Sequence, residues 1–447
     1  METPICDFVE RYAQSQALRL HMPGHKGRSF LGVEHLDITE IDGADSLYEA
    51  DGIIHRSELN AGALFGCPTF YSTEGSSQCI RAMLYLAAMH ARRNNRKPLI
   101  AAARNVHKTF LSAAALLDLD VLWLYPEQQD SYLSCRVDPA ALEATLTQAS
   151  EKPAAVYVTS PDYLGNVTDI HGLAEVCHRY GILLLVDSAH GAYLHFLQPS
   201  RHPIDLGADL CCDSAHKTFP VLTGGAYLHI SPAAPSCFVE QAKNALALFG
   251  STSPSYLILQ SLDKTNAYLA QDYPAQLPAF VSEVRKLKDS LTAHGYCLLG
   301  EEPLKLTIRA KPFGYTGKQL SSLLLEQNII CEFADPDFLV MMFTPETTAV
   351  GLHKLESALL AIPPKCPLAQ EPPAFHACER VLSVREAALS PCETLPVSAC
   401  AGRILAAASV SCPPAVPIVI CGERIDAEAI RCFSYYGIDT CTVVSES

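Results

Sequence analysis

Short apolar runs alternate with amphipathic stretches through the middle of the chain. Five runs have the length of strands and contain no regular polar alternation: 98–103, 154–159, 182–186, 208–212 and 224–230. Such runs are typical of strands buried on both faces, as in a parallel sheet covered by helices. The pattern therefore predicts an α/β core over residues 65–265 with a mostly parallel sheet.

Amphipathic stretches predict the helices. Within residues 76–94 the apolar side chains recur at the spacing of one helix face: Ile80, Met83, Leu84 and Ala87. A second helical stretch covers about 255–295. Residues 1–64 are rich in Gly, His and Asp and have weak periodicity, which predicts an extended arm rather than part of the core.

The rest of the chain predicts two smaller domains. Residues 266–362 contain strand-like runs at 305–310 and 338–343, which flank a helix around 319–327, so this part is expected to be α+β. A proline-rich segment then marks a boundary. Residues 363–447 are predicted to form a small C-terminal domain, which holds eight of the eighteen cysteines but no metal-ligand spacing.

Composition and charge exclude several classes of protein. Of the 447 residues, 49% are hydrophobic and 18% are charged, which excludes an intrinsically disordered chain. The formal net charge is −15 and there is no long basic run, so binding to nucleic acid or to an anionic membrane surface is not expected. A negative charge is compatible with a small cationic substrate.

Cysteine usage and apolar length predict a reduced, soluble, cytoplasmic protein. No cysteines have the C-x-x-C spacing of a zinc ribbon or a redox pair. The first residues, METPICDFVERY, lack the pattern of a signal peptide. The longest apolar candidate, 182–186, is far shorter than a membrane span and ends at Asp187.

Lys217 lies in an unusual place for a charged residue. It follows a predicted buried strand within the segment DSAHKT (213–218), and a glycine pair comes next at 224–225. A lysine at a strand end is most often a solvated surface charge. The alternative is a lysine that forms an imine with a carbonyl and is kept partly deprotonated by its surroundings. The segment alone does not decide between them.

Asp187 comes directly after another predicted buried strand. Open α/β sheets bind ligands at the carboxyl ends of their strands, although Asp is also a common helix N-cap. Asp187 and Lys217 together are what pyridoxal phosphate (PLP) requires. A carboxylate keeps the pyridinium nitrogen protonated, and a lysine carries the aldehyde as an imine.

Two further segments extend the candidate site. TEGSSQ (73–78) opens the predicted helix, where free backbone N–H groups and hydroxyls suit a phosphate. An ordinary serine N-cap is the alternative there. An imidazole at His107, after the run 98–103, can stack on a flat cofactor, although a lone histidine is more often structural.

Eight segments, in order along the chain, carry a resemblance to a known family: HMPGHKGR (21–28), DITEIDGADSLYEADGII (37–54), RNVHKT (104–109), VTSPDYLGNVTDI (158–170), VDSAHGAYLHF (186–196), DSAHKTFPVLTGGAYLHI (213–230), STSPSYLILQSLD (251–263) and PLKLTIRA…GYTG…CEFADPDFLVMM (303–342). They resemble the Orn/Lys/Arg decarboxylases, which are prokaryotic, fold-type-I PLP enzymes. The resemblance spans nearly the whole chain, which makes it far more specific than one motif. The chain resembles the short form, without the N-terminal wing domain of the larger members.

The resemblance implies an aspartate aminotransferase-like fold and a role for each site residue. Lys217 would form the internal aldimine, and Asp187 would pair with the pyridine nitrogen. His107 would stack on the ring, and His190 would lie beside it near the phenolic oxygen. Five residues would hold the phosphate or support the imine: Gly75, Ser76, Ser77, Ser214 and His216. Fold-type-I enzymes are dimers with shared sites, so a homodimer is expected, in which STSPSY (251–256) reaches the neighbouring site.

The implied reaction is α-decarboxylation of lysine, ornithine or arginine to the amine and CO2. Lys217 or His216 would protonate Cα after CO2 is lost. Glu332 and Asp335 are candidates for binding the distal cation of the substrate, against the alternative of plain surface charge. Two other interpretations are open: a PLP-dependent aminotransferase or lyase on another amino acid, and a non-catalytic relative that binds the cofactor or a partner protein.

Three segments depart from the family pattern. Ser188 stands where Glu is usual, and TEGSS replaces the commoner Asn-Gly-Ser/Thr. PPAVPIVICGE (413–423) lacks a Gly and a Pro of the family's segment, which is expected to help shape the substrate end. These departures therefore concern which substrate the protein takes more than which cofactor it binds.

Overall fold

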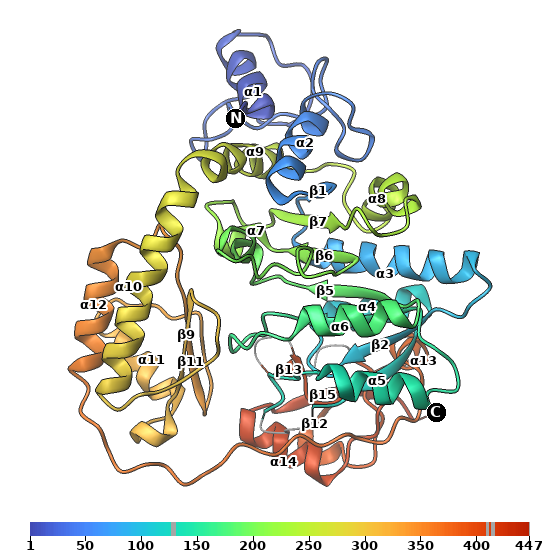
Figure 1. Cartoon of the computed structure of the whole chain (residues 1–447), viewed down its shortest axis with the longest axis vertical. Helices are drawn as coiled ribbons and strands as arrows, with labels where there is room; N and C mark the ends of the chain where they lie inside the picture. Colours follow the sequence, from blue (N-terminus) through green and yellow to red (C-terminus); the bar gives the residue numbers. More distant parts are fainter. Residues whose placement is uncertain (127–130, 408–410, 413–415, 447) are drawn as a thin grey trace. The chain divides into compact units, whose positions relative to one another are not determined.

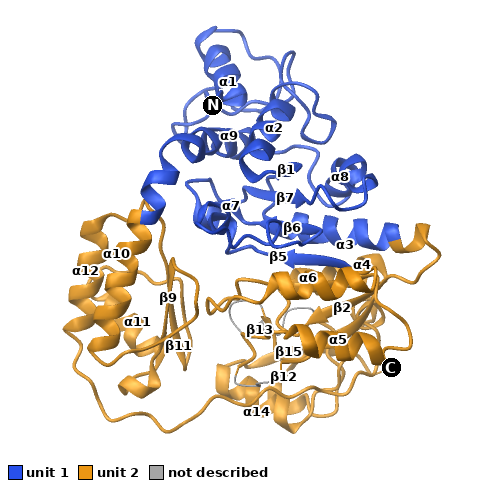
Figure 2. Cartoon of the chain, in the orientation of Figure 1, with its two compact units in different colours: residues 1–90, 183–278 blue, residues 91–182, 279–447 orange. Residues whose placement is uncertain are grey.

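The computed structural model describes residues 1–126, 131–407, 411–412 and 416–446. The chain divides into two compact units, residues 1–90 with 183–278 and residues 91–182 with 279–447 (Figure 2). Figure 1 labels most of the helices and many of the strands of both units. The predicted domains (1–64, 65–265, 266–362 and 363–447) divide the chain differently from these two units, and their boundaries stay a prediction.

The first unit carries four strands in the order β1-β7-β6-β5. These strands are β1 (Thr69–Ser72), β5 (Leu183–Asp187), β6 (Leu210–Asp213) and β7 (Ala226–Ile230). Its helices are α1 (Pro4–Gln14), η1 (Leu47–Glu49), α2 (Ile53–Phe65), η2 (Ala192–Phe196), α7 (Ala215–Thr218), α8 (Cys237–Ala247) and α9 (Tyr256–Gln271). Two helices cross between the units: α3 (Ser76–Arg93) and α10 (Tyr273–Ala293).

The direction of the strands decides which strand ends share an edge. β5 and β6 are parallel, whereas β7 runs antiparallel to both β6 and β1. The link from β6 to β7 holds only the one-turn helix α7, and a parallel connection would need a longer crossover. Because two antiparallel pairings restore the direction, β1, β5 and β6 all end at the same edge.

The prediction that residues 1–64 form an extended arm is wrong for two segments. α1 buries Ile5 and Val9, and α2 buries Ile54 and Phe65. The carboxylate of Asp263 in α9 accepts hydrogen bonds from the backbone N–H groups of residues 5 and 6, both at 3.0 Å. These contacts satisfy donors that a helix start leaves open. The partner is more than 250 residues away, so the local pattern gives no sign of it.

The predicted helical stretch 255–295 is two helices, α9 and α10, which meet at Asp272. Pro274 is the second residue of α10. Proline has no backbone N–H to continue the hydrogen bonds of a preceding helix, but it is tolerated in a first helical turn. A new helix therefore starts there.

The second unit contains a parallel set of strands in the order β4-β2-β3 and an antiparallel sheet in the order β10-β11-β9-β8. The strands are β2 (Leu99–Ala103), β3 (Asp120–Leu124), β4 (Ala155–Thr159), β8 (Cys297–Leu299), β9 (Lys305–Arg309), β10 (Phe333–Ala334) and β11 (Phe338–Met342). The helices among them are α4 (Lys108–Leu117), α5 (Pro139–Gln148), α6 (Ile170–Arg179), η3 (Lys311–Phe313), α11 (Gly317–Leu325) and α12 (Ala349–Leu360). The predicted strands 305–310 and 338–343, with a helix between them, are thus confirmed.

The C-terminal part of this unit has its own small elements. They are α13 (Val384–Leu389), β12 (Cys392–Pro396), η4 (Val397–Ala399), β13 (Ser411–Cys412), β14 (Val416–Pro417), α14 (Ala427–Tyr436) and β15 (Thr440–Val444). β12 pairs with β15, and β13 pairs with β14. Phe375, Phe433 and Val443 contribute to a core that also includes Phe338 of β11. This core attaches the C-terminal residues to the rest of the unit.

Arg104, just after β2, fixes the segment that follows β14. Its buried guanidinium donates to the carbonyls of Pro417 at 2.8 Å and Ile418 at 3.0 Å, and it lies 3.5 Å from the carboxylate of Glu423. Residues 413–415 of the segment that departs from the family pattern lie outside the described residues. The remainder of that segment is held by this arginine.

No helix in the part of the chain that the structure describes is long and apolar enough to cross a membrane. The cysteines that the structure describes are free thiols, and most of them are buried.

Candidate active site

The predicted site residues of the first unit gather at the edge where β1, β5 and β6 end. Asp187 is the last residue of β5 and lies opposite Cys212 of β6. Ser214 follows β6, and Gly75 and Ser76 follow β1. Because the three strands run in one direction, segments more than 100 residues apart in sequence meet at this edge.

Lys217 lies in the one-turn helix α7 and is half-buried. Its Nζ is 3.1 Å from Nε2 of His190, which is buried. The neighbouring His216 donates from Nδ1 to the carbonyl of Gly225 at 3.0 Å, and burial lowers the pKa of its imidazole. The lysine amine therefore has a proton-exchange partner within hydrogen-bond distance, unlike a solvated surface charge.

Asp187 is buried at the end of its strand. Its Oδ1 accepts the backbone N–H of Ala189 at 3.2 Å and is 3.7 Å from the thiol of Cys212. The next helical element, η2, has Gly191 as its N-cap. The alternative that Asp187 caps a helix is therefore wrong.

The phosphate end of the predicted site consists of hydroxyls at a helix start. α3 begins at Ser76, and Ser214 donates to the Ser76 hydroxyl at 2.9 Å. Ser77 follows in the first turn of the helix. Backbone N–H groups at a helix start and nearby hydroxyls form a site for an anion.

Two glycines bring the backbone together beside this helix start. The N–H of Gly75 donates to the carbonyl of Gly224 at 2.7 Å. Gly224 has φ +104°, and a Cβ there would meet the carbonyl oxygen of Thr73 at 2.8 Å. Only glycine permits this approach.

Asp213 forms a buried cluster that the sequence did not reveal. His202 and His229 each place Nε2 3.0 Å from its Oδ2, and all three side chains are buried. Burial alone would raise the pKa of Asp213, but the two histidines hold it well below its usual value. The cluster lies directly before Ser214 and supports the segment that carries Lys217.

Replacing Asp213 by Asn should cost about 3–5 kcal/mol of unfolding free energy, because the variant loses the charge of a buried, doubly hydrogen-bonded carboxylate. Since the folded-state pKa is depressed, this contribution is complete above the unfolded value of about 3.9 and is lost as the pH falls below it. Urea unfolding of both proteins between pH 3 and 7 measures the difference.

Asp205→Asn is the matched control for this cluster. Asp205 also pairs with a histidine, His195, at 2.7 Å, but at the surface. Surface pairs contribute about 1 kcal/mol or less. Equal losses in the Asp213 and Asp205 variants would contradict the assignment.

These groups of the first unit fit PLP by their chemistry. A half-buried lysine amine beside an imidazole suits the aldehyde, and a buried strand-end carboxylate suits the pyridine nitrogen. The helix start with Ser76, Ser77 and Ser214 suits the phosphate.

The other predicted residues belong to the second unit. His107 is the N-cap of α4, and its Nδ1 accepts the backbone N–H of Thr109 at 3.2 Å. This contact supports the alternative that His107 is a structural residue. The stacking of its imidazole on the cofactor stays a prediction.

Glu332 is exposed and accepts from the hydroxyl of Tyr163 at 3.0 Å. Asp335 is not a surface charge: it is buried, and burial raises its pKa to about 6.

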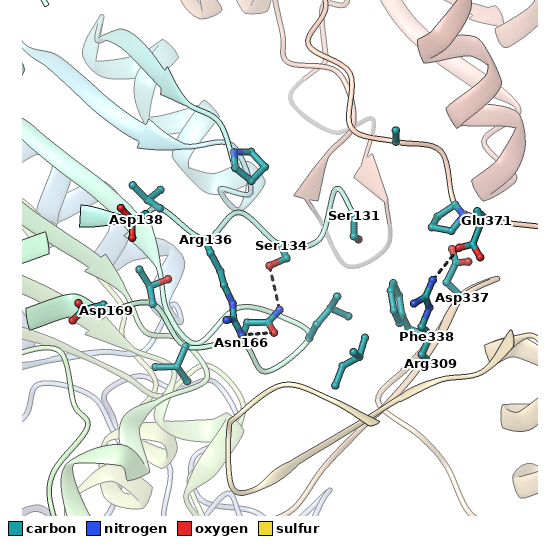
Figure 3. A pocket seen from close by; sticks show the side chains of 18 of the residues that line it. Ser131, Ser134, Arg136, Asp138, Asn166, Asp169, Arg309, Asp337, Phe338 and Glu371 are labelled. Carbon is teal, nitrogen blue, oxygen red and sulfur yellow. Dashed lines mark hydrogen bonds and ion pairs between the residues drawn. The ribbon is translucent and has the colours of Figure 1, made fainter. Parts of the chain in front are cut away.

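A cavity of about 830 Å³ lies in the second unit, among the segments that follow β3 and β4 (Figure 3). Its charged side chains already have structural partners. Arg136 donates to Asn166 at 2.9 Å, and Arg309 pairs with Glu371 at 2.9 Å. Asp138, which also lines the cavity, is the N-cap of α5. None of the predicted site residues lines this cavity, and its walls come from segments too far apart for sequence reasoning to assemble.

The fold is that of the fold-type-I PLP-dependent enzymes. A lysine decarboxylase from Francisella novicida matches with a TM-score of 0.79 at 15% identity, over 99% of this chain and 81% of that one. A serine palmitoyltransferase from Sphingomonas wittichii matches with a TM-score of 0.56 at 15% identity, over 81% and 83% of the two chains. The predicted α/β class with a mostly parallel sheet is confirmed.

The sequence identifies the family within that class. The model of the Orn/Lys/Arg decarboxylase major domain matches residues 3–299, and that of the C-terminal domain matches residues 377–439. An arginine decarboxylase from Bacillus subtilis is 29% identical, over 96% of this chain and 92% of its own. The chain belongs to the Orn/Lys/Arg decarboxylase family, and the prediction of a PLP-dependent amino-acid decarboxylase is confirmed.

Proposed function

We propose that the protein removes the α-carboxylate of a basic amino acid, with PLP held at the site of the first unit. The observation that carries the proposal is the 3.1 Å contact between Lys217 and His190, at the strand edge where Asp187 ends β5. A lysine amine for the aldehyde and a buried carboxylate for the pyridine nitrogen are the groups that this cofactor takes from a protein.

Each residue has a role that follows from its surroundings. Lys217 would hold the cofactor, and its Nζ would return a proton to Cα of the substrate. His190, whose Nε2 lies 3.1 Å away, would exchange that proton with the amine. Asp187 would keep a proton on the ring nitrogen, and Ser76, with Ser214, would bind the phosphate. PLP, when bound, supplies the electron sink for the electron pair that CO2 leaves on Cα.

The substrate should be lysine, ornithine or arginine. The relative named arginine decarboxylase, which aligns with nearly the whole chain, makes arginine the first to test. The net charge of −15 is a weaker argument in the same direction.

Incubating the PLP-loaded protein with each of the three amino acids should release CO2 and the matching amine from at least one. A site built for a distal cation leaves its acidic group unpaired when norleucine binds. The value of kcat/KM for norleucine should therefore be roughly tenfold to a few hundredfold lower than for the preferred basic amino acid. Mass spectrometry of the amines measures both rates. Equal rates on norleucine and on the best of the three basic amino acids, or activity only with an added keto acid, would contradict the proposal.

We also propose that the protein is a homodimer. In the irregular segment between α1 and η1, four apolar side chains are more than three-quarters exposed: Leu18, Leu20, Phe30 and Leu31. Residues 18–33, which hold these four side chains, carry Arg19, Lys26 and Arg28 and no acidic residue, whereas the whole chain is strongly acidic. A second copy therefore offers this stretch a partner of opposite charge, and the exposed residues 251–253 would belong to the same interface. Light scattering of the pure protein, with a chain mass of 48.5 kDa, tests the dimer.

A further inference from the structure

The C-terminal part of the second unit gathers a histidine, a cysteine and an aspartate that the proposed reaction does not use. A ring nitrogen of His376, the thiol of Cys378 and a carboxylate oxygen of Asp426 all lie within 4.8 Å of one another. Nε2 of His376 is 2.6 Å from Oδ2 of Asp426. No metal-ligand spacing is visible in the sequence, because Asp426 comes 48 positions after Cys378.

Backbone pairing brings together the two segments that carry these side chains. Arg380 forms an antiparallel bridge with Glu423, and the N–H of Arg424 donates to the carbonyl of Glu379 at 2.8 Å. The segment that carries His376 and Cys378 therefore runs antiparallel to the segment that leads to Asp426. Asp426 is also the N-cap of α14, and its Oδ1 accepts the N–H of Ala429 at 2.9 Å. The other oxygen, Oδ2, is the one that faces His376.

We propose that His376, Cys378 and Asp426 bind a divalent transition-metal ion of the Zn²⁺ type, with the fourth position taken by water. Imidazole nitrogen, thiolate sulfur and carboxylate oxygen are the three ligand types that Zn²⁺ takes from proteins. Two such N and O ligands on a tetrahedral ion lie about 3.3 Å apart, so the 2.6 Å pair must open by roughly 0.7 Å. His376 and Asp426 are each 40% exposed, which gives them the freedom to move and gives the ion a path in.

The cysteine separates this proposal from an ordinary ion pair. A His–Asp ion pair does not need a thiol. The thiol of Cys378 nevertheless lies within 4.8 Å of both groups, although this residue is buried. Burial, together with the nearby carboxylates of Glu423 and Asp426, raises the pKa of this thiol to about 12. A bound dication would reverse that preference, because a coordinating thiol is deprotonated.

The bound ion would join the start of the C-terminal domain to helix α14. Its two ligand segments, residues 376–378 and the N-cap of α14, are otherwise joined by short backbone pairing. Metal binding to the folded state adds to folding stability, so this domain should be the part that gains. The inference does not depend on the proposed reaction, since none of its residues belongs to the PLP site.

The test uses the full chain without a histidine tag, stripped of metal by a chelator and then titrated with Co²⁺ or Zn²⁺. We expect one ion per chain, a Co²⁺ spectrum with a thiolate charge-transfer band, and a higher melting temperature with Zn²⁺. His376→Gln and Cys378→Ser should each weaken binding by roughly a hundredfold or more, and Cys378→Ser should also remove the charge-transfer band.

Two controls keep the outcome clear in a chain with eighteen cysteines. Cys400→Ser, which changes a buried cysteine of the same domain outside the cluster, should leave binding and spectrum unchanged. His376→Gln alters a partly exposed residue, so its melting temperature without metal should match that of the parent. Binding that survives both cluster variants, or a Co²⁺ spectrum without the thiolate band, would overturn the proposal.

Discussion

Replacing Lys217 by alanine should lower kcat by roughly a thousandfold or more, while the melting temperature changes little. The amine is the group expected both to hold PLP and to return the proton to Cα, and its partner at 3.1 Å, His190, cannot hold the aldehyde in its place. The side chain is half-buried at the end of a one-turn helix, so its removal opens no core cavity. Steady-state kinetics and thermal unfolding of the two proteins measure these effects.

Borohydride reduction provides a second readout for Lys217. In the parent protein it should fix the cofactor covalently to the peptide that contains Lys217, and in the alanine variant it should not. Lys264→Ala is the control, because Lys264 is an exposed lysine of the same unit and should keep full labelling. Covalent cofactor in the Lys217→Ala protein would show that another lysine holds it.

Replacing Asp187 by asparagine should lower kcat by roughly 10²–10³-fold, while the affinity for PLP falls by about tenfold or less. The carboxylate acts on the charge that develops as CO2 leaves, whereas the phosphate contacts around Ser76 supply most of the binding. The side chain is buried and keeps its size in the variant, so packing should be preserved. Cofactor titration and kinetics on the best substrate separate the two effects.

Asp209 offers a matched control for this prediction. It is also a buried aspartate of the same strand pair, but it lies at the opposite end, where its Oδ2 accepts the N–H of Leu184 at 2.7 Å. Asp209→Asn should lower the melting temperature and leave kcat largely unchanged. If Asp187→Asn behaves like this control, or if it weakens PLP binding as strongly as it lowers kcat, Asp187 has only a structural role.

The sequence alone determined those structural features that depend on residues close together in the chain. The five apolar runs became β2, β4, β5, β6 and β7, since a strand buried on both faces must be apolar at every position. The helix predicted from residue 76 begins at Ser76, as expected for hydroxyl residues before an amphipathic stretch. The position of Asp187 at the end of β5 and that of Lys217 shortly after β6 followed from the same local order.

Only the tertiary structure decided which distant groups meet. The antiparallel direction of β7 lets β1 end beside β5 and β6, and this brings Ser76 to Ser214. The partner of α1 is Asp263, and the sequence offered no sign of either the helix or its anchor. Likewise, no spacing rule joins the histidines at 202 and 229 to Asp213. Apolar periodicity reports whether a segment is buried, whereas pairings between distant segments arise from strand register and packing, which no single segment encodes.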